Sequence, residues 1–359
     1  MTPVRVLHLV DIQPGTDGRC LHRLVRRTVE GLQGCGEHVV LEVGGGERRQ
    51  PYLPRTSGRL GPSRMLVGGG VSGEPLWRVL EVWANAGRPF DLVHCWGDAS
   101  LRLRAACAGG PPTYCTLDSM VLDASMMIDV HDLSGIVPLE IQVGSVGMVD
   151  ALHEAGLELE VAVVPFGLDV DRSSADPVRR DSWGVDDGTM VFGVVGDRIG
   201  KASLGSLVGV PVRLAASGRD VRIIASEETG GFADCRRWLH DMDRKGLLVA
   251  DDMTQAAGSS VDFALAQGTT GRCGEVTGLL AILESLAASR PVLLGHGHPA
   301  CRELSECDAV FSGMDHAETD AARWLLSRSG DQRVDASGLL SDVSTWCGSL
   351  AGRYAVLAE

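Results

Sequence analysis

The chain has 359 residues, of which 44% are hydrophobic and 22% are charged, and its formal net charge is −14. This length exceeds the size at which a single hydrophobic core stops growing, and the composition is that of a folded globular protein, so we predict two domains. The negative charge argues against a nucleic acid partner, because duplex binding needs a basic surface that neutralises phosphates. The longest apolar runs, such as residues 161–168, are too short to span a bilayer, which needs roughly 20 residues.

The N-terminal residues contain no basic region followed by an apolar stretch and a cleavage site, so we expect a cytoplasmic protein. The ten cysteines are scattered without any C-x-x-C pair, and we expect them to be reduced thiols of the core. Zinc ligands usually come at short, regular spacings, which this sequence lacks. We therefore predict no metal site.

The chain begins with a βαβ pattern. Residues 4–10 form a mainly apolar run rich in Val and Leu, which is typical of a strand buried on both faces of a parallel sheet. A loop rich in Gly and Pro follows at residues 14–18, then a helical pattern at 20–32 and a second strand at 38–43. Residues 44–73 are rich in Gly, Arg, Pro and Ser without a clear period, and we predict a surface connection there.

The alternation of strands and helices then continues along the whole chain. In the first half we predict helices at residues 76–86, 100–108 and 148–155, and strands at 92–96, 113–117, 140–144 and 160–164. In the second half we predict strands at 190–195, 221–225, 247–249, 261–265 and 291–294, and helices at 204–216, 232–244 and 279–288. Repeated βα units with short connections predict two doubly wound parallel sheets.

Pro, Gly, Ser and Asp accumulate in residues 165–187, where we place the boundary between the two halves. Ligands of open parallel sheets bind beyond the carboxyl ends of the strands. Two such sheets that face each other would therefore form a site in the cleft between them.

Four segments, in order along the chain, resemble the retaining glycosyltransferases of family 4. The first is VRVLHLVDIQPGTDG, which is similar to the opening strand and glycine loop of the family, and the second is FDLVHCWG. The third, VAVVPFGLDVDR, matches a family signature at Pro165, Gly167 and Asp169. The fourth is EVTGLLAILESLAASRPVLL, and the last residues, STWCGSLAGRYAVLAE, resemble the closing helix of the family.

This resemblance implies a GT-B architecture of two Rossmann-like domains that face a cleft. Residues 1–168 would form the acceptor-side domain and residues 169–335 the domain that binds the nucleotide sugar. Residues 336–359 would form a helix that packs back toward the first domain. The implied activity is transfer of a sugar from a UDP-, GDP- or ADP-sugar to an unknown acceptor, with retention at the anomeric carbon and without a metal or other cofactor.

The resemblance also indicates residues for the donor side. The departing diphosphate must be neutralised by cationic side chains and helix N-termini if no metal is bound. The family places an Arg and a Lys after the first strand of the second domain, and GDRIGK offers Arg198 and Lys201 at a shorter spacing. Glu275 would contact the transferred sugar, and Glu284 would accept hydrogen bonds from both ribose hydroxyls, although their spacing is one residue longer than in the family.

On the acceptor side, the family has a His after a strand where this chain has Asp118. A carboxylate can accept a hydrogen bond from a sugar hydroxyl, but it cannot both donate and accept as a neutral imidazole does. His94 is a second candidate to face the sugar, with the alternative that it is a core histidine whose partners are nearby. Gly15 and Gly18 lie in the first loop, where backbone N–H groups can meet an anion or the acceptor.

Arg19, Arg23, Arg26 and Arg27 recur at helical spacing and predict a basic helix face. Such a face is usually solvated. The alternative is contact with an acidic acceptor or a weak peripheral contact with an anionic membrane surface.

The sequence leaves two classes of function open. One is an active glycosyltransferase. The other is a degenerate GT-B protein that binds a nucleotide sugar or a partner protein without turnover, which the altered Arg/Lys and Glu/Glu spacings and Asp118 in place of His would explain. A GT-B epimerase or phosphorylase is disfavoured, because the resemblance is to the segments of family 4.

Overall fold

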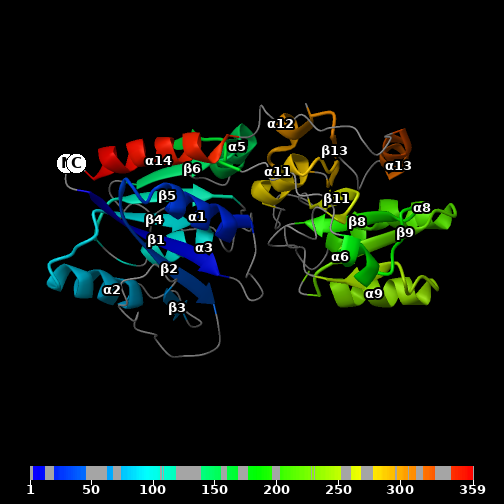
Figure 1. The fold of residues 1–359 in the computed structure, drawn as a ribbon, viewed down its shortest axis with the longest axis horizontal. Coiled ribbons are helices and arrows are strands. Elements are labelled where there is room, and N and C mark those ends of the chain that lie inside the picture. Colours follow the sequence, from blue (N-terminus) through cyan, green and yellow to red (C-terminus); the bar gives the residue numbers. More distant parts are fainter. Residues whose placement is uncertain are drawn as a thin grey trace.

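A computed structural model describes most of the chain in eighteen stretches of residues, and the findings below concern these alone. The described residues are 3–12, 20–45, 63–67, 74–105, 107, 109–118, 139–154, 160–168, 177–195, 203–227, 229, 231–251, 260–267, 278–295, 297–305, 307–312, 318–327 and 341–358. They form two α/β units that lie side by side (Figure 1). Among these residues, no helix combines the length and the apolar character needed to cross a membrane.

The first unit is built on a seven-stranded sheet with the order β3-β2-β1-β4-β5-β6-β7, in which every neighbouring pair is parallel. Its strands are β1 (Val4–Ile12), β2 (Gly36–Gly45), β3 (Ser63–Val67), β4 (Leu92–Trp96), β5 (Thr113–Leu117), β6 (Leu139–Val143) and β7 (Val161–Val163). The helices between them are α1 (Cys20–Gly31), α2 (Glu74–Asn85), α3 (Asp98–Ala105) and α5 (Val146–Glu154).

The second unit is built on a six-stranded parallel sheet with the order β10-β9-β8-β11-β12-β13. Its strands are β8 (Met190–Val195), β9 (Val221–Ala225), β10 (Leu248–Ala250), β11 (Phe263–Ala266), β12 (Val292–Leu294) and β13 (Val310–Ser312). Its helices are α6 (Pro177–Ser182), α7 (Ser203–Leu207), α8 (Gly209–Ala216), α9 (Phe232–Asp241), α11 (Leu279–Ala287), α12 (Cys301–Ser305) and α13 (Glu318–Ser327).

These sheets confirm the predicted fold class of two doubly wound parallel sheets. Two details of the prediction are wrong. Residues 44–73 contain the edge strand β3, which pairs with β2. This strand is short and flanked by glycines, so its sequence shows no hydrophobic periodicity that would have predicted it. The single helix predicted at 204–216 is two helices, α7 and α8, and α8 begins at Gly209. The interruption is explained by Pro211, which has no N–H to donate and whose ring clashes with the carbonyl group four residues earlier.

The side chains of the first sheet alternate between two packed faces. Val6 and Val10 of β1, together with Trp96 of β4, lie in a cluster with the apolar residues of α1 and the last helix, α14 (Val343–Leu357). Leu7 and Leu9 lie on the other face, in a cluster with residues of α2, α3 and α5. The first cluster also contains residues of α11 and β12, so a continuous apolar core joins the two units.

The last helix, α14, returns to the first unit and covers its sheet (Figure 1). The Trp346 indole N–H donates to the Thr28 hydroxyl of α1 at 3.0 Å, and both side chains are buried. The chain leaves the first unit beside the point where it returns, since Gly167 and Ser341 form an isolated parallel bridge. Gly167 is required there because an added Cβ would lie 2.4 Å from the Cβ of Trp346.

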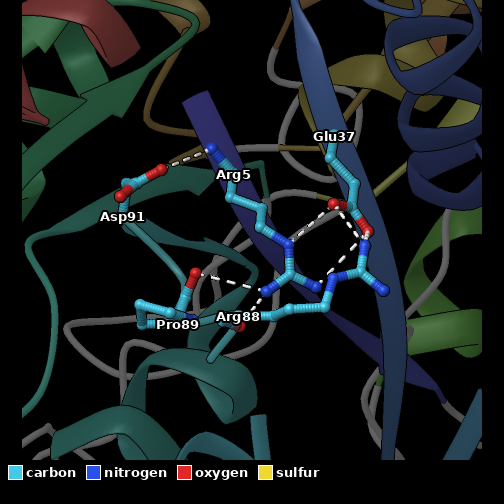
Figure 2. Close-up of polar contacts among 5 residues, drawn as sticks. All are labelled: Arg5, Glu37, Arg88, Pro89 and Asp91. Atoms are coloured by element: carbon cyan, nitrogen blue, oxygen red, sulfur yellow. Dashed lines mark hydrogen bonds and ion pairs between the residues drawn. The ribbon is translucent and has the colours of Figure 1, made fainter. Parts of the chain in front are cut away.

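The amino ends of β1 and β2 are held together by the buried guanidinium of Arg5 (Figure 2). Its Nε donates to Glu37 at 2.8 Å, and its Nη1 donates to the carbonyl oxygens of Arg88 and Pro89. The same group lies 4.6 Å from the centre of the Trp83 ring, within the range of a cation–π contact. Ligands of such folds bind at the carboxyl ends of the strands. The Arg5 cluster lies at the amino ends, which is the opposite edge of the sheet.

Candidate functional site

The strand order of each sheet reverses once, between β1 and β4 in the first unit and between β8 and β11 in the second. Doubly wound sheets bind ligands beyond the carboxyl ends of the strands at this reversal. Helix α1 follows β1 and helix α11 follows β11, and these two helices contact each other across the boundary (Figure 1). The two regions where each sheet would bind a ligand therefore face one another.

Asp118 lies at the carboxyl end of β5 and reaches the N-terminus of α11. It is only 4% exposed, and its Oδ1 accepts a hydrogen bond from the backbone N–H of Leu280 at 2.7 Å. Helix α11 has no acidic residue in its first turn, and its N-cap is Gly278, which has no side chain to cap with. A carboxylate from the first unit therefore caps a helix of the second unit, where the helix dipole favours a negative charge.

Gly278 makes room for this carboxylate. Its backbone angles, φ −59° and ψ 141°, are open to any residue, so glycine is not needed for the conformation. A Cβ at this position would instead lie 2.3 Å from Oδ2 of Asp118. The glycine therefore permits the close approach of an anion to the start of α11.

Glu284 lies one turn further along α11 and pairs with Arg23 of α1. Its Oε1 accepts from Arg23 Nε at 3.0 Å, and its Oε2 pairs with Arg23 Nη2. The two side chains are only 10% and 18% exposed, so the pair is shielded from water. This is a two-pronged contact in which an arginine donates to both oxygens of a carboxylate.

A similar contact runs in the opposite direction at α5. The backbone N–H of Gly147, in the first turn of α5, donates to Glu303 of α12 at 2.9 Å, so a carboxylate of the second unit caps a helix of the first. The two elements are so close that a Cβ at Gly147 would lie 1.7 Å from the carbonyl oxygen of Pro299. The other carboxylate oxygen of Glu303 is buried without a hydrogen-bond partner.

His94 has the environment of a core histidine. It is fully buried, its Nε2 lies 2.8 Å from the Thr116 hydroxyl, and its Nδ1 lies 2.5 Å from the Tyr354 hydroxyl of α14. Burial, and then the neighbouring His8 and His38, hold its pKa well below the usual value, so the ring is neutral. Both ring nitrogens of His94 make hydrogen bonds to buried hydroxyls, so neither is accessible to a sugar hydroxyl in this arrangement.

Six of the predicted residues lie outside the described residues: Gly15, Gly18, Arg19, Arg198, Lys201 and Glu275.

The predicted basic face of the first helix needs a correction. Arg26 is exposed and Arg27 is half-buried, but Arg23 turns inward to Glu284 and does not belong to a solvated face. Arg23 borders the buried side of α1, which Leu24 and the other apolar residues of the helix form. The position of Arg23 next to the apolar side of α1 was the sequence signal that its guanidinium would pair with a buried group and not face solvent.

Within the described stretches, His, Cys, Asp and Glu side chains do not gather in groups of three or more that would hold a metal ion. Eight cysteines whose side chains the structure describes are free thiols: Cys35, Cys95, Cys107, Cys115, Cys235, Cys301, Cys307 and Cys347. Five of these are buried, as predicted, whereas Cys301 and Cys307 are half-buried and Cys35 is exposed.

The chain was compared with known protein families, curated sequences and solved structures. Neither the models of known protein families nor the sequences of curated proteins match the chain. Solved structures match along its length. A glycosyltransferase from Rickettsia africae ESF-5 has a TM-score of 0.64 at 11% identity and covers 100% of both chains. A sucrose-phosphate synthase from Thermosynechococcus elongatus has a TM-score of 0.64 at 12% identity, covering 99% of this chain and 96% of that one.

A third match is the trehalose-6-phosphate protein of E. coli solved with bound UDP-2-fluoro glucose. Its TM-score is 0.62 at 13% identity, over 97% of this chain and 98% of that one. At such low identities the likeness establishes the fold. The chain has the GT-B fold of these glycosyltransferases, with two Rossmann-like units.

Proposed function

We propose that this protein is a metal-independent, retaining glycosyltransferase of the family 4 type, which moves a sugar from a UDP-, GDP- or ADP-sugar to an acceptor that is still unknown. The observation that carries the proposal is the arrangement of α11. Its capped N-terminus and Glu284 lie four residues apart, at the reversal point of the second sheet and facing the first unit.

This spacing suits a nucleoside diphosphate. Four residues of an α-helix span about 6 Å along its axis, which is on the order of the distance between a ribose and the phosphate beyond it. The N-terminus of α11 can stabilise a phosphate through its N–H groups and dipole. The carboxylate of Glu284 can accept hydrogen bonds from the two ribose hydroxyls.

The remaining roles are proposed from the sequence. Arg198 and Lys201 follow β8, the other strand at the reversal point, and would neutralise the leaving diphosphate. Glu275 would contact the transferred sugar, and the loop with Gly15 and Gly18 would lie toward the acceptor. The proposal assigns no sugar contact to His94, because its ring nitrogens are used in the core.

A calorimetric screen with UDP, GDP and ADP, followed by the sugars of whichever nucleotide binds, tests the proposal. We expect one base to bind, and we expect Lys201→Ala to weaken the diphosphate far more than the matching nucleoside, because its proposed contact is with phosphate. Lys245→Ala is the matched control, since Lys245 is the other lysine of the chain. Absence of binding by all three nucleotides would contradict the proposal.

Turnover separates an enzyme from a protein that only binds. The donor that binds is incubated with a chelator, and its anomeric proton is followed by NMR. An active transferase releases nucleotide under these conditions with retention of configuration, and Lys201→Ala slows release by about a hundredfold or more. Tight binding without release of product after long incubation would assign the chain to the degenerate class.

A further inference from the structure

The first unit occupies both of the positions that the proposed donor would use. The carboxylate of Asp118 is bound to the N-terminus of α11, and the guanidinium of Arg23 is bound to both oxygens of Glu284. The two contacts lie one helical turn apart, and each crosses the boundary between the units. Asp118 and Arg23 come from separate elements, the end of β5 and helix α1, so their joint position is not a local effect of sequence.

Each contact reproduces the chemistry of one part of a nucleotide. The carboxylate of Asp118 supplies an anion to the backbone N–H of Leu280 at the start of α11, as a phosphate could do. Arg23 presents two parallel N–H donors to Glu284, and a ribose presents two neighbouring O–H donors to a carboxylate in a similar way. The same helix face cannot hold both sets of groups at once.

We propose that Asp118 and Arg23 form a latch that holds the two units closed in the absence of donor, and that the nucleotide part of the donor must displace both side chains in order to bind. This inference rests on the proposed function. It makes the closed, latched arrangement a competitor of the donor.

The surroundings of the latch suit a movement of this kind. The chain crosses between the units next to Gly167 and Ser341, where Leu168 N donates to Ser341 O at 3.0 Å and Ser341 N donates to Phe166 O at 3.1 Å. The described ends of the two crossings are thus hydrogen-bonded to each other, and two adjacent crossings can serve as a hinge.

The latch should lower the apparent affinity of the protein for nucleotide by an amount that can be measured. The apparent dissociation constant of a ligand is its intrinsic value divided by the fraction of protein that is competent to bind. If the latched form makes up nine-tenths of the protein, removing the latch raises the apparent affinity about tenfold. Loss of a residue that merely contacts the nucleotide changes affinity in the opposite direction.

The experiment compares the full-length protein with Asp118→Ala, Arg23→Ala and the double variant. Titration calorimetry uses UDP, GDP and ADP without a sugar, so that any contact of Asp118 with the sugar does not enter the result. Small-angle X-ray scattering of the same samples without nucleotide reports the separation of the units. We expect a larger radius of gyration in each variant, a higher affinity for the nucleotide that binds, and the largest change in the double variant.

Arg26→Ala and Asp150→Ala are the matched controls, because both side chains are exposed and lie on α1 and α5 of the same unit. Gly278→Ala is a second route to the same state, since its methyl group would displace the Asp118 carboxylate without altering Asp118. It should enlarge the radius of gyration as Asp118→Ala does.

The outcomes separate the two proposals. Unchanged scattering, or an affinity that falls or stays the same in folded Asp118→Ala and Arg23→Ala variants, overturns the latch. If no nucleotide binds the original protein or the double variant, in which the latch is absent, the proposed donor site itself is wrong. Opening of the units together with tighter nucleotide binding supports both.

Discussion

The hydroxyl of Tyr354 and the Nδ1 of His94 are 2.5 Å apart, although 260 residues separate them in the chain. Tyr354 lies in α14 and His94 in β4, and both are fully buried. The other nitrogen of His94 meets Thr116, whose hydroxyl also accepts from the Gln142 amide at 2.5 Å. A continuous chain of hydrogen bonds thus joins the last helix to the middle of the first sheet.

Replacement of Tyr354 by Phe removes one partner of a buried imidazole and keeps the ring. The unpaired Nδ1 should cost about 1–3 kcal/mol of unfolding free energy, measured by urea denaturation. Val356→Ala, at an exposed position of the same helix, should change stability by less than about 0.5 kcal/mol. Equal stability of the two variants would show that the hydroxyl contributes nothing to the docking of α14.

The buried histidines predict a loss of stability in mild acid. Burial lowers the pKa of His8 and His94 well below the usual value, and it lowers that of His38. The unfolded chain takes up protons near pH 6.5 while the folded protein does not. Stability is therefore complete above about pH 6.5 and falls below it, by about 1.4 kcal/mol per pH unit for each histidine that stays neutral.

Urea midpoints between pH 8 and pH 5 measure this slope. Salt-bridged carboxylates such as Glu37, whose pKa is lowered mainly by its hydrogen bond from Arg5, lose their contribution only at lower pH. His94→Gln should make the slope about one third shallower. His240→Gln, on the exposed surface of α9, should leave it unchanged, and a slope that responds equally to both changes would rule out the buried histidines as its source.

Arg5 and Arg88 share Glu37 as a partner but should differ in their effect on stability. Arg5 is buried and also donates to two carbonyl oxygens, so Arg5→Lys, which keeps the charge and loses the planar fork, should cost about 2–4 kcal/mol. Arg88 is largely exposed, and Arg88→Ala should cost less than about 1 kcal/mol. Urea unfolding distinguishes them, and nucleotide affinity should be unchanged in both because this cluster lies at the opposite edge of the sheet.

Gly147→Ala should separate the two units on the side of α5. Its methyl group would lie 1.7 Å from the Pro299 carbonyl oxygen, and this can be relieved only by a backbone shift that weakens the Gly147–Glu303 contact. We expect a lower thermal midpoint and a larger radius of gyration. Gly205→Ala in α7 meets no neighbouring atom and should instead raise stability by about 0.5–1 kcal/mol. Similar behaviour of the two variants would contradict the close packing at Gly147.

Strands whose side chains are buried on both faces were predictable from the sequence. The predicted bounds of β4, β5, β8 and β9 match the structure, because each of these segments is mainly apolar. The edge strand β3 was missed because its pairing with β2 stabilises it, and pairing between distant segments leaves no local pattern.

The candidate site was predictable only in part. Glu284 and Asp118 were identified as polar residues next to the expected binding region, but their present partners were not. The partner of Glu284 is 261 residues away in the chain, and Asp118 meets a backbone N–H, which carries no sequence signal. One hydrogen-bond partner of His94 is likewise distant in sequence, since Tyr354 reaches it only through the return of the last helix.

The return of α14 to the first unit also sets the order in which the protein can be completed during synthesis. Trp346, Leu350 and Tyr354 belong to the same core as Val6 and Trp96, so the unit that leaves the ribosome first lacks part of its interior until α14 (Val343–Leu357) emerges. The second unit, from β8 to α13, has all of its strands earlier. The half of the protein that is translated first is therefore the half that finishes folding last, and a nascent chain that is released before residue 341 exposes the apolar face that α14 would cover.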